Sequence, residues 1–81
     1  MPDLFKINCY ISFYMKQYDF LEITFTYDYF GDFCTLTIFD KETYATYKGQ
    51  FTTNYMFHID DAINTFLARR QYDLKRGVEN G

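Results

Sequence analysis

The fold is decided by residues 21–39, LEITFTYDYFGDFCTLTIF, in which apolar and polar residues alternate on both sides of a short turn. An alternation with a period of two is typical of half-buried β-strands. The pair Gly31-Asp32 is a turn signal for a two-residue β-hairpin, which places Phe30 opposite Phe33. With this register, apolar side chains gather on one side of the hairpin and threonines on the other, whereas a slip of one residue would mix the two faces.

The same alternation extends to both sides of this hairpin. Residues 44–52 form a further candidate strand after a turn at residues 40–43. Toward the N-terminus, apolar residues occupy the odd positions Phe5, Ile7, Cys9, Ile11, Phe13 and Met15. We therefore expect four antiparallel strands joined by short loops as a meander. Their expected bounds are about residues 4–15, 20–30, 33–39 and 44–52.

After Thr53 the period changes from two to that of a helix. One stripe at helical spacing is formed by Met56, Ile59, Ile63, Phe66, Leu67, Arg70 and Leu74. It predicts one helix over about residues 56–76, followed by a frayed tail at residues 77–81. An early start would be capped by Asn54 or Thr53. The predicted fold class is α+β, a four-stranded antiparallel meander followed by one C-terminal helix packed on one sheet face.

The size of the chain predicts a single domain over residues 1–81. Four strands of this length give a sheet face of roughly 19 by 30 Å. The predicted helix is about 25 Å long and roughly 10 Å wide, so it covers about half of that face. Either the sheet curls around the helix or a second chain covers the rest, which favours a homodimer or another protein partner.

Composition and charge exclude several classes of protein. With 48% hydrophobic and 23% aromatic residues, the chain is too apolar to be disordered. No apolar run could span a bilayer, and Asp3 stands where a signal peptide would be basic, so we expect a cytoplasmic protein without a membrane partner. The net charge of −3 is uneven, with nine acids against four bases in residues 1–68 and four bases against two acids in residues 69–81.

Two charged groups lie near the ends of the predicted helix. Asp60 and Asp61 are expected in its first turn, where the helix dipole favours acidic side chains. A basic cluster near its last turn consists of Arg69, Arg70, Lys75 and Arg76. The dipole favours cations there, which explains most of this cluster without a ligand.

The sequence carries no motif for catalysis or metal binding. Cys9 and Cys34 are expected to be buried thiols, and the single histidine, His58, belongs to the start of the helix. A nucleophile needs an oriented base within reach, and no such spacing exists. Neither a phosphate-binding glycine loop nor a calcium-binding run is present. We expect no enzymatic activity, no metal and no cofactor.

The outer face of the predicted sheet is unusually aromatic. The candidate partner-binding residues there and at its turns are Tyr10, Tyr14, Phe30, Phe33, Phe39 and Tyr44. Tyrosine and threonine have high strand propensity, which alone accounts for part of this composition. Exposed phenylalanines stabilise a monomer little, however, and tyrosine-rich surfaces of low charge suit protein interfaces.

The sequence therefore favours a small non-enzymatic protein-binding module. In size, charge and composition it resembles phage-encoded proteins that block host machinery, including anti-CRISPR proteins, which implies an inhibitor that acts by stoichiometric binding. One alternative is a single-stranded nucleic-acid-binding protein, with bases stacked on the aromatic face and phosphates on the basic cluster; the acidic net charge makes nucleic acid the weaker partner. The other alternative is a structural subunit of a homo-oligomer.

Overall fold

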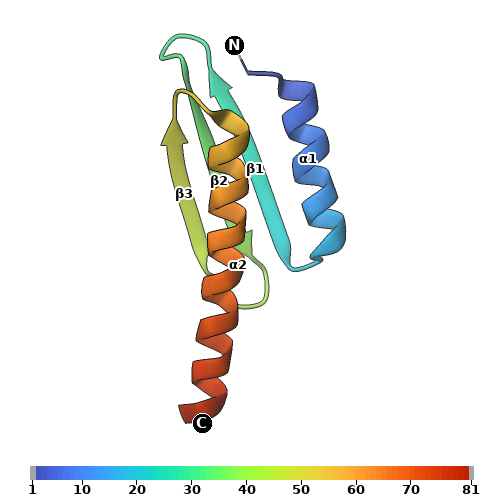
Figure 1. Ribbon diagram of the computed structural model, residues 1–81, viewed down its shortest axis with the longest axis vertical. Helices are drawn as coiled ribbons and strands as arrows, with labels where there is room; N and C mark the ends of the chain where they lie inside the picture. Colours follow the sequence, from blue (N-terminus) through green and yellow to red (C-terminus); the bar gives the residue numbers. More distant parts are fainter. Residues whose placement is uncertain (1, 81) are drawn as a thin grey trace.

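The computed structural model describes residues 2–80, and side chains as far as Arg76. The element order is α1 (Leu4–Gln17), β1 (Leu21–Asp28), β2 (Phe33–Asp40), β3 (Thr46–Phe51) and α2 (Tyr55–Asn80) (Figure 1). The strands form one antiparallel sheet in the order β1-β2-β3. The predicted α+β class with an antiparallel meander is confirmed, but four strands and a single helix are wrong: there are three strands and two helices.

The first element, α1, is a helix where a strand was predicted over residues 4–15. The carboxylate of Asp3 accepts the N–H of Lys6 at 3.0 Å and caps the helix. Ile7 and Ile11 are buried four residues apart, on one helical face. Odd positions four apart satisfy both a strand and a helix pattern, which is why the alternation misled. Cys9, also at an odd position, is exposed and not the buried thiol expected.

The β1–β2 hairpin has the predicted faces but a different register. Asp28 pairs with Phe33, so the loop is four residues long and Phe30 does not face Phe33. The carboxylate of Asp28 closes this loop by accepting the N–H groups of Phe30 and Gly31, at 2.9 and 3.1 Å. Because the register moved by two residues, the side chains within β1 and β2 kept the faces that the alternation predicted, whereas Tyr29, expected on the core face, lies in the loop and is exposed.

The third strand is shorter than predicted because its entry is a turn. Tyr44 has a positive φ of 65°, and its N–H donates to the carbonyl of Asp40 at 2.8 Å. β3 therefore begins at Thr46 instead of residue 44. Gly49 and Phe51 pair with buried residues of β2 and share their face, as the alternation predicted.

Helix α2 begins early and extends further than expected. The N–H of His58 donates to the carbonyl of Asn54 at 3.0 Å, so the early start is confirmed. Asp60 and Asp61 consequently lie past the first turn, not in it. The helix continues to Asn80, so the predicted tail is helical as far as the structure describes it, and Gly81 lies outside the described residues. The helix dipole therefore explains neither the two acids nor the basic cluster.

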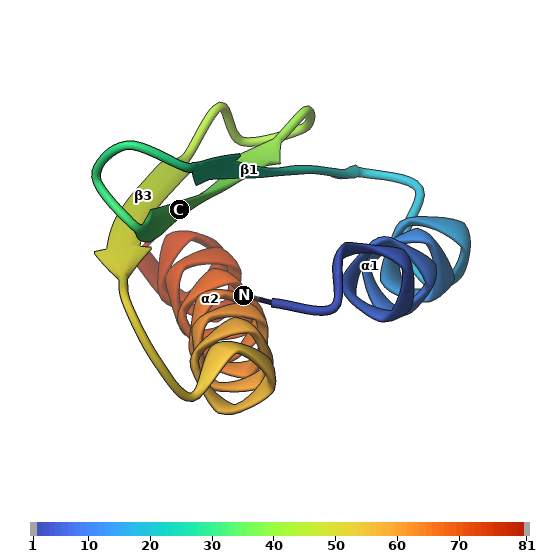
Figure 2. The ribbon, with the colours of Figure 1, turned by 90° about the horizontal axis from the view of Figure 1, so that it is seen from above.

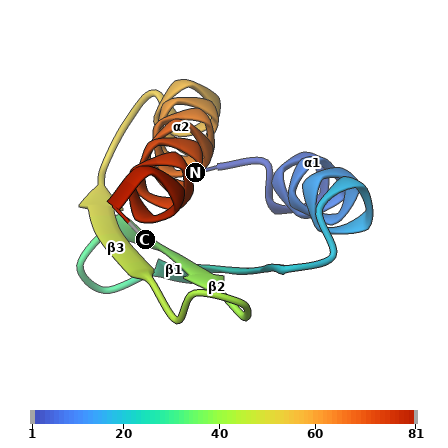
Figure 3. The same cartoon turned by 90° about the horizontal axis from the view of Figure 1, so that it is seen from below.

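Both helices cover the same face of the sheet (Figures 2 and 3). α1 packs on β1, and α2 packs on β2 and β3. The buried hydrophobic core between them consists of Ile7, Ile11, Leu21, Ile23, Leu36, Ile38, Ile59, Ala62 and Ile63. α1 covers the part of this sheet face that α2 alone would leave exposed, so this face does not require a partner chain. The opposite face of the sheet is covered by none of the described elements.

Candidate interaction surface

The uncovered side of the sheet, called here the open face, is polar in its centre. Thr24 lies opposite Thr37, and Thr26 opposite Thr35. The residues of the open face are Glu22, Thr24, Thr26, Asp28, Phe33, Thr35, Thr37, Phe39, Thr46, Lys48 and Gln50. Two acids and one lysine give this surface little net charge.

One end of the open face carries an aromatic pair. The ring centroids of Phe39 and Tyr44 are 6.2 Å apart with an interplanar angle of 57°. The left-handed conformation of Tyr44 places its side chain outside the ladder, where it is 77% exposed. The two rings together present an apolar surface beside Glu22, which pairs with Phe39 across the ladder.

The other end carries a second aromatic group at the β1–β2 turn. Phe30 is fully exposed because the loop closed by Asp28 holds its side chain away from the sheet. A hollow on this side is lined by Phe30, Phe33, Thr35 and Gln50, among others. Phe33 and Phe39 lie six residues apart on β2, so the two aromatic ends are separated by about 20 Å.

Two of the predicted partner-binding residues lie elsewhere. Tyr10 and Tyr14 project from α1 toward the core, on the side opposite the open face, because residues 4–15 are helical. The Tyr10 hydroxyl donates to the carboxylate of Asp60 on α2, and its ring packs edge-on against Tyr14. Burial, together with the hydrogen bonds to Asp60 and Tyr14, raises the pKa of Tyr10 far above its usual range. Tyr10, supported by Tyr14, therefore joins the two helices.

A buried ion pair ties α2 to the end of the sheet. Arg70 Nε donates to Asp40 Oδ2 at 2.7 Å, and a second guanidinium nitrogen contacts Glu42. The guanidinium lies over the ring of Phe20 at 3.6 Å from the centroid. Asp40 is fully buried, and its other oxygen accepts the backbone N–H groups of Glu42 and Thr43. Nothing local in the sequence indicates this cluster, because Asp40 and Arg70 are thirty residues apart.

The Asp40 carboxyl titrates below its usual range. Burial alone would raise its pKa, but hydrogen bonds from the Thr43 backbone, the Arg70 guanidinium and the Glu42 backbone outweigh that effect and lower the pKa. Its contribution to stability is therefore fully present above the unfolded pKa, about 3.9, and is lost as the pH falls through the lower folded pKa.

This shift predicts a dependence of stability on acid. In urea unfolding followed by circular dichroism, the free energy of unfolding should fall as the pH is lowered below about 4. The variant Asp40→Asn should be less stable at neutral pH, and its stability should fall less steeply in acid. If the free energies of unfolding of the two proteins fall equally steeply as the pH is lowered, the titration cannot be assigned to Asp40.

The basic cluster does not act as one group. Arg70 is occupied by Asp40 and Glu42, whereas Arg69 is exposed and lies 4.0 Å from Asp73. Lys75 and Arg76 are exposed on the part of α2 that extends beyond the sheet (Figure 1). Arg69 and Arg70 approach the β2–β3 turn from the helix side, so the four cations form no single basic patch on the open face.

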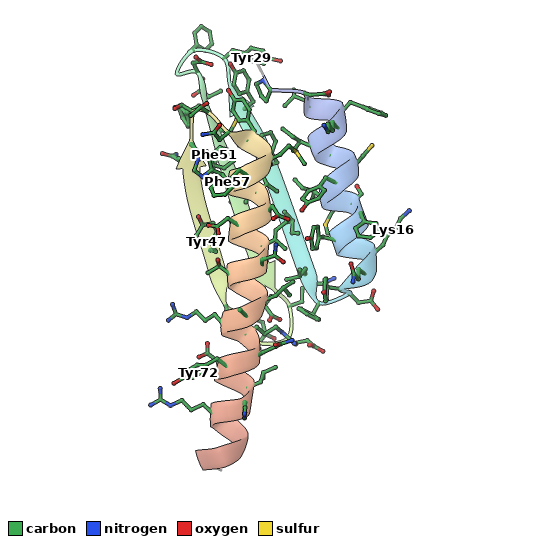
Figure 4. The ribbon with its side chains drawn as sticks, viewed as in Figure 1. Lys16, Tyr29, Tyr47, Phe51, Phe57 and Tyr72 are labelled. Atoms are coloured by element: carbon green, nitrogen blue, oxygen red, sulfur yellow. The ribbon has the colours of Figure 1, made fainter. Side chains whose placement is uncertain are left out.

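The surroundings of Cys34 and His58 do not favour nucleophilic chemistry. Burial raises the pKa of the Cys34 thiol, which disfavours the thiolate that a nucleophile requires. His58 stacks on Phe51 at a centroid distance of 5.1 Å, at the start of α2 (Figure 4 labels Phe51). Among the described residues, no group of three or more His, Cys, Asp or Glu side chains could hold a metal ion.

One exposed feature was missed at the sequence level. Phe5, Cys9 and Phe13 form a stripe along the outer side of α1 at four-residue spacing. Their spacing would have shown this stripe if residues 4–15 had been interpreted as a helix.

Comparison with protein-family models, with curated protein sequences and with solved structures gives no match to this chain. Neither described helix has a stretch long and apolar enough to cross a membrane.

Proposed function

We propose that this protein is a non-enzymatic protein-binding module that meets its partner through the open face of the sheet. The observation that carries the proposal is the placement of both helices on one side, which leaves the other side to the solvent. A polar threonine centre with aromatic groups at both ends offers hydrogen bonds and large apolar contacts together.

The low charge of this face supports a protein as the partner. Threonine hydroxyls and a few charges match the polar part of typical interfaces, while Phe39, Tyr44 and Phe30 are candidates for the residues that carry most of the binding energy. Nucleic acid is less well supported, because phosphates need a basic groove and the open face holds Lys48 alone among its described cations. In its finer form, the proposal is a stoichiometric inhibitor of the phage type, including the anti-CRISPR type, that acts by occupying its target.

The proposal predicts that the aromatic pair is needed for capture of a partner. Tagged protein is incubated with cell lysate, with and without nuclease, and the co-purified protein is quantified. The double variant Phe39→Ser/Tyr44→Ser should lower the amount captured about tenfold or more, since truncating an aromatic residue that carries binding energy costs about 2 kcal/mol or more. The matched control, Phe5→Ser/Phe13→Ser, removes two exposed aromatic residues from α1 and should leave capture unchanged.

Two results would count against this function. Equal capture by the wild type and the open-face variant would remove the open face from the interaction. Loss of every captured species after nuclease treatment would favour the nucleic-acid alternative. Melting curves of both variants show whether each is folded before capture is compared.

A further inference from the structure

The two edges of the sheet differ in how they are protected. α1 lies along the β1 edge (Figure 2), where the sulfur of Met15 accepts the N–H of Ile23 at 3.4 Å. None of the described residues covers the outer edge of β3 in this way, and no described strand pairs with it. An uncovered edge strand is a template for pairing with another extended chain.

The direction of the β3 backbone groups follows from one hydrogen bond. The carbonyl of Ala45 accepts the N–H of Asp40 at 2.9 Å and so points toward β2. Because direction alternates along a strand, the backbone groups of Tyr47 and Gly49 also point toward β2. Those of Thr46, Lys48 and Gln50 point outward, where an extended chain can pair with them.

A groove between β3 and α2 adds a charge pattern beside this edge. Its lining includes Tyr47 on the strand and Asp61, Thr65 and Arg69 on the helix. These three helical residues are four apart and so share one side of α2. From Asp61 to Arg69 the pattern is acidic, neutral and basic, which becomes complementary to itself when a second helix runs antiparallel to it. Asp73, the next residue of this side, lies 4.0 Å from Arg69 of its own chain, in an exposed and loose contact.

We propose that a second copy of this chain pairs antiparallel along the β3 edge and extends the sheet to six strands. The two-fold axis passes beside Tyr47 and Thr65. In this arrangement Asp61 of each copy lies opposite Arg69 of the other, which gives two symmetric ion pairs. The proposal is independent of the function assigned to the open face, which stays uncovered in the dimer.

Two constraints limit the position of the axis and are met at Tyr47. When two β3 strands pair, a residue whose backbone groups point outward must lie opposite another such residue. An axis between two residues would place an outward-pointing residue opposite an inward-pointing one, so the two-fold axis passes through a residue. An axis at Lys48 would place two lysines directly opposite each other, which destabilises a pair of strands. An axis at Tyr47 pairs Lys48 with Thr46 instead.

The level of the helix agrees with this choice. Phe51 of β3 stacks on His58 of α2, so these two residues lie at the same level along the strand and the helix. From there, four strand residues back to Tyr47 span about 13 Å. Seven helical residues on to Thr65 span about 11 Å. Tyr47, 41% exposed on β3, and Thr65 therefore reach the same level of the groove, where one axis serves both (Figure 4 labels Tyr47).

Sedimentation velocity of the purified chain over a range of concentrations tests the strand pairing. The wild type should be dimeric, and Lys48→Pro should be monomeric, because proline removes an outward N–H without breaking a bond to β2. The control Lys48→Ala keeps that N–H and should remain dimeric. Circular dichroism verifies that the proline variant is folded. A wild type that is monomeric at the highest concentration would overturn the proposal.

Charge reversal tests the helix contact and does not depend on the proline variant. Asp61→Lys and Arg69→Glu should each dimerise more weakly, because each places like charges opposite each other. An equimolar mixture of the two variants should restore dimers. In the mixed dimer, the introduced lysine of one chain faces the introduced glutamate of the other. The native Arg69 of the first chain then faces the native Asp61 of the second. If the mixture behaves as the two separate variants do, the proposed arrangement is wrong. The open-face variant Phe39→Ser/Tyr44→Ser should remain dimeric, which separates this proposal from the proposed function.

Discussion

Replacement of Arg70 by methionine should destabilise the protein by about 3–5 kcal/mol, because it leaves the buried carboxylate of Asp40 without its charged partner. Asp40 is fully buried, and the side chain of Arg70 is 16% exposed, so water cannot substitute for the lost contact. Small domains are stable by only about 5–15 kcal/mol. The expected loss is therefore a large fraction of the free energy of unfolding. Urea unfolding at neutral pH measures it.

The neighbouring residue provides a matched control for this experiment. Arg69 has the same chemistry but is exposed and pairs loosely with Asp73, so Arg69→Met should change stability by no more than about 0.5 kcal/mol. A double-mutant cycle with Asp40→Asn should show a strong coupling with Arg70→Met. Equal effects of the two arginine substitutions would mean that the Asp40–Arg70 pair does not hold α2 to the sheet.

Truncation of Ile11 to alanine should cost about 2–5 kcal/mol, whereas truncation of Phe13 should cost less than about 0.5 kcal/mol. Ile11 is 3% exposed and packs in the core, while Phe13, two residues later, is 63% exposed. In a strand these two residues would point to the same face and both would be buried. The contrast in unfolding free energy therefore tests the helical state of α1 directly.

The first two turns of α1 contain a second pair of a buried and an exposed residue, Ile7 and Phe5. Ile7→Ala should resemble Ile11→Ala, and Phe5→Ala should resemble Phe13→Ala. Similar losses at all four odd positions would favour the strand that the alternation suggested. Hydrogen exchange of the α1 amides provides a second measurement, since intrahelical hydrogen bonds protect them without a neighbouring strand.

Local pattern was sufficient wherever one interpretation alone fitted the residues. The alternation in β1 and β2 assigned each side chain to its face, and the four-residue loop closed by Asp28 changed the register without changing those faces. The stripe through Ile59 and Ile63 likewise predicted the buried side of α2. The same alternation placed Phe33 and Phe39 on the outer face of the sheet, where the structure has them half-buried.

Where two patterns fitted, local information was insufficient. Ile7 and Ile11 satisfy both a strand and a helix, and aromatic and β-branched residues favour strands intrinsically. The cap formed by Asp3 was the local sign of a helix that the alternation obscured. Tyr10 and Tyr14 consequently pack against the core from α1, where Tyr10 contacts Asp60 of α2, and do not lie on the expected sheet face.

Periodicity along the chain was enough to predict the α+β class, the faces of the hairpin and the amphipathic side of α2, because it is a property of neighbouring residues. Packing in three dimensions was needed to establish that residues 4–15 form a helix, that Arg70 pairs with Asp40, and that one face and one edge of the sheet remain uncovered by the described residues. These outcomes depend on residues far apart in the chain, whose burial and charge become defined only when the helices pack on the sheet.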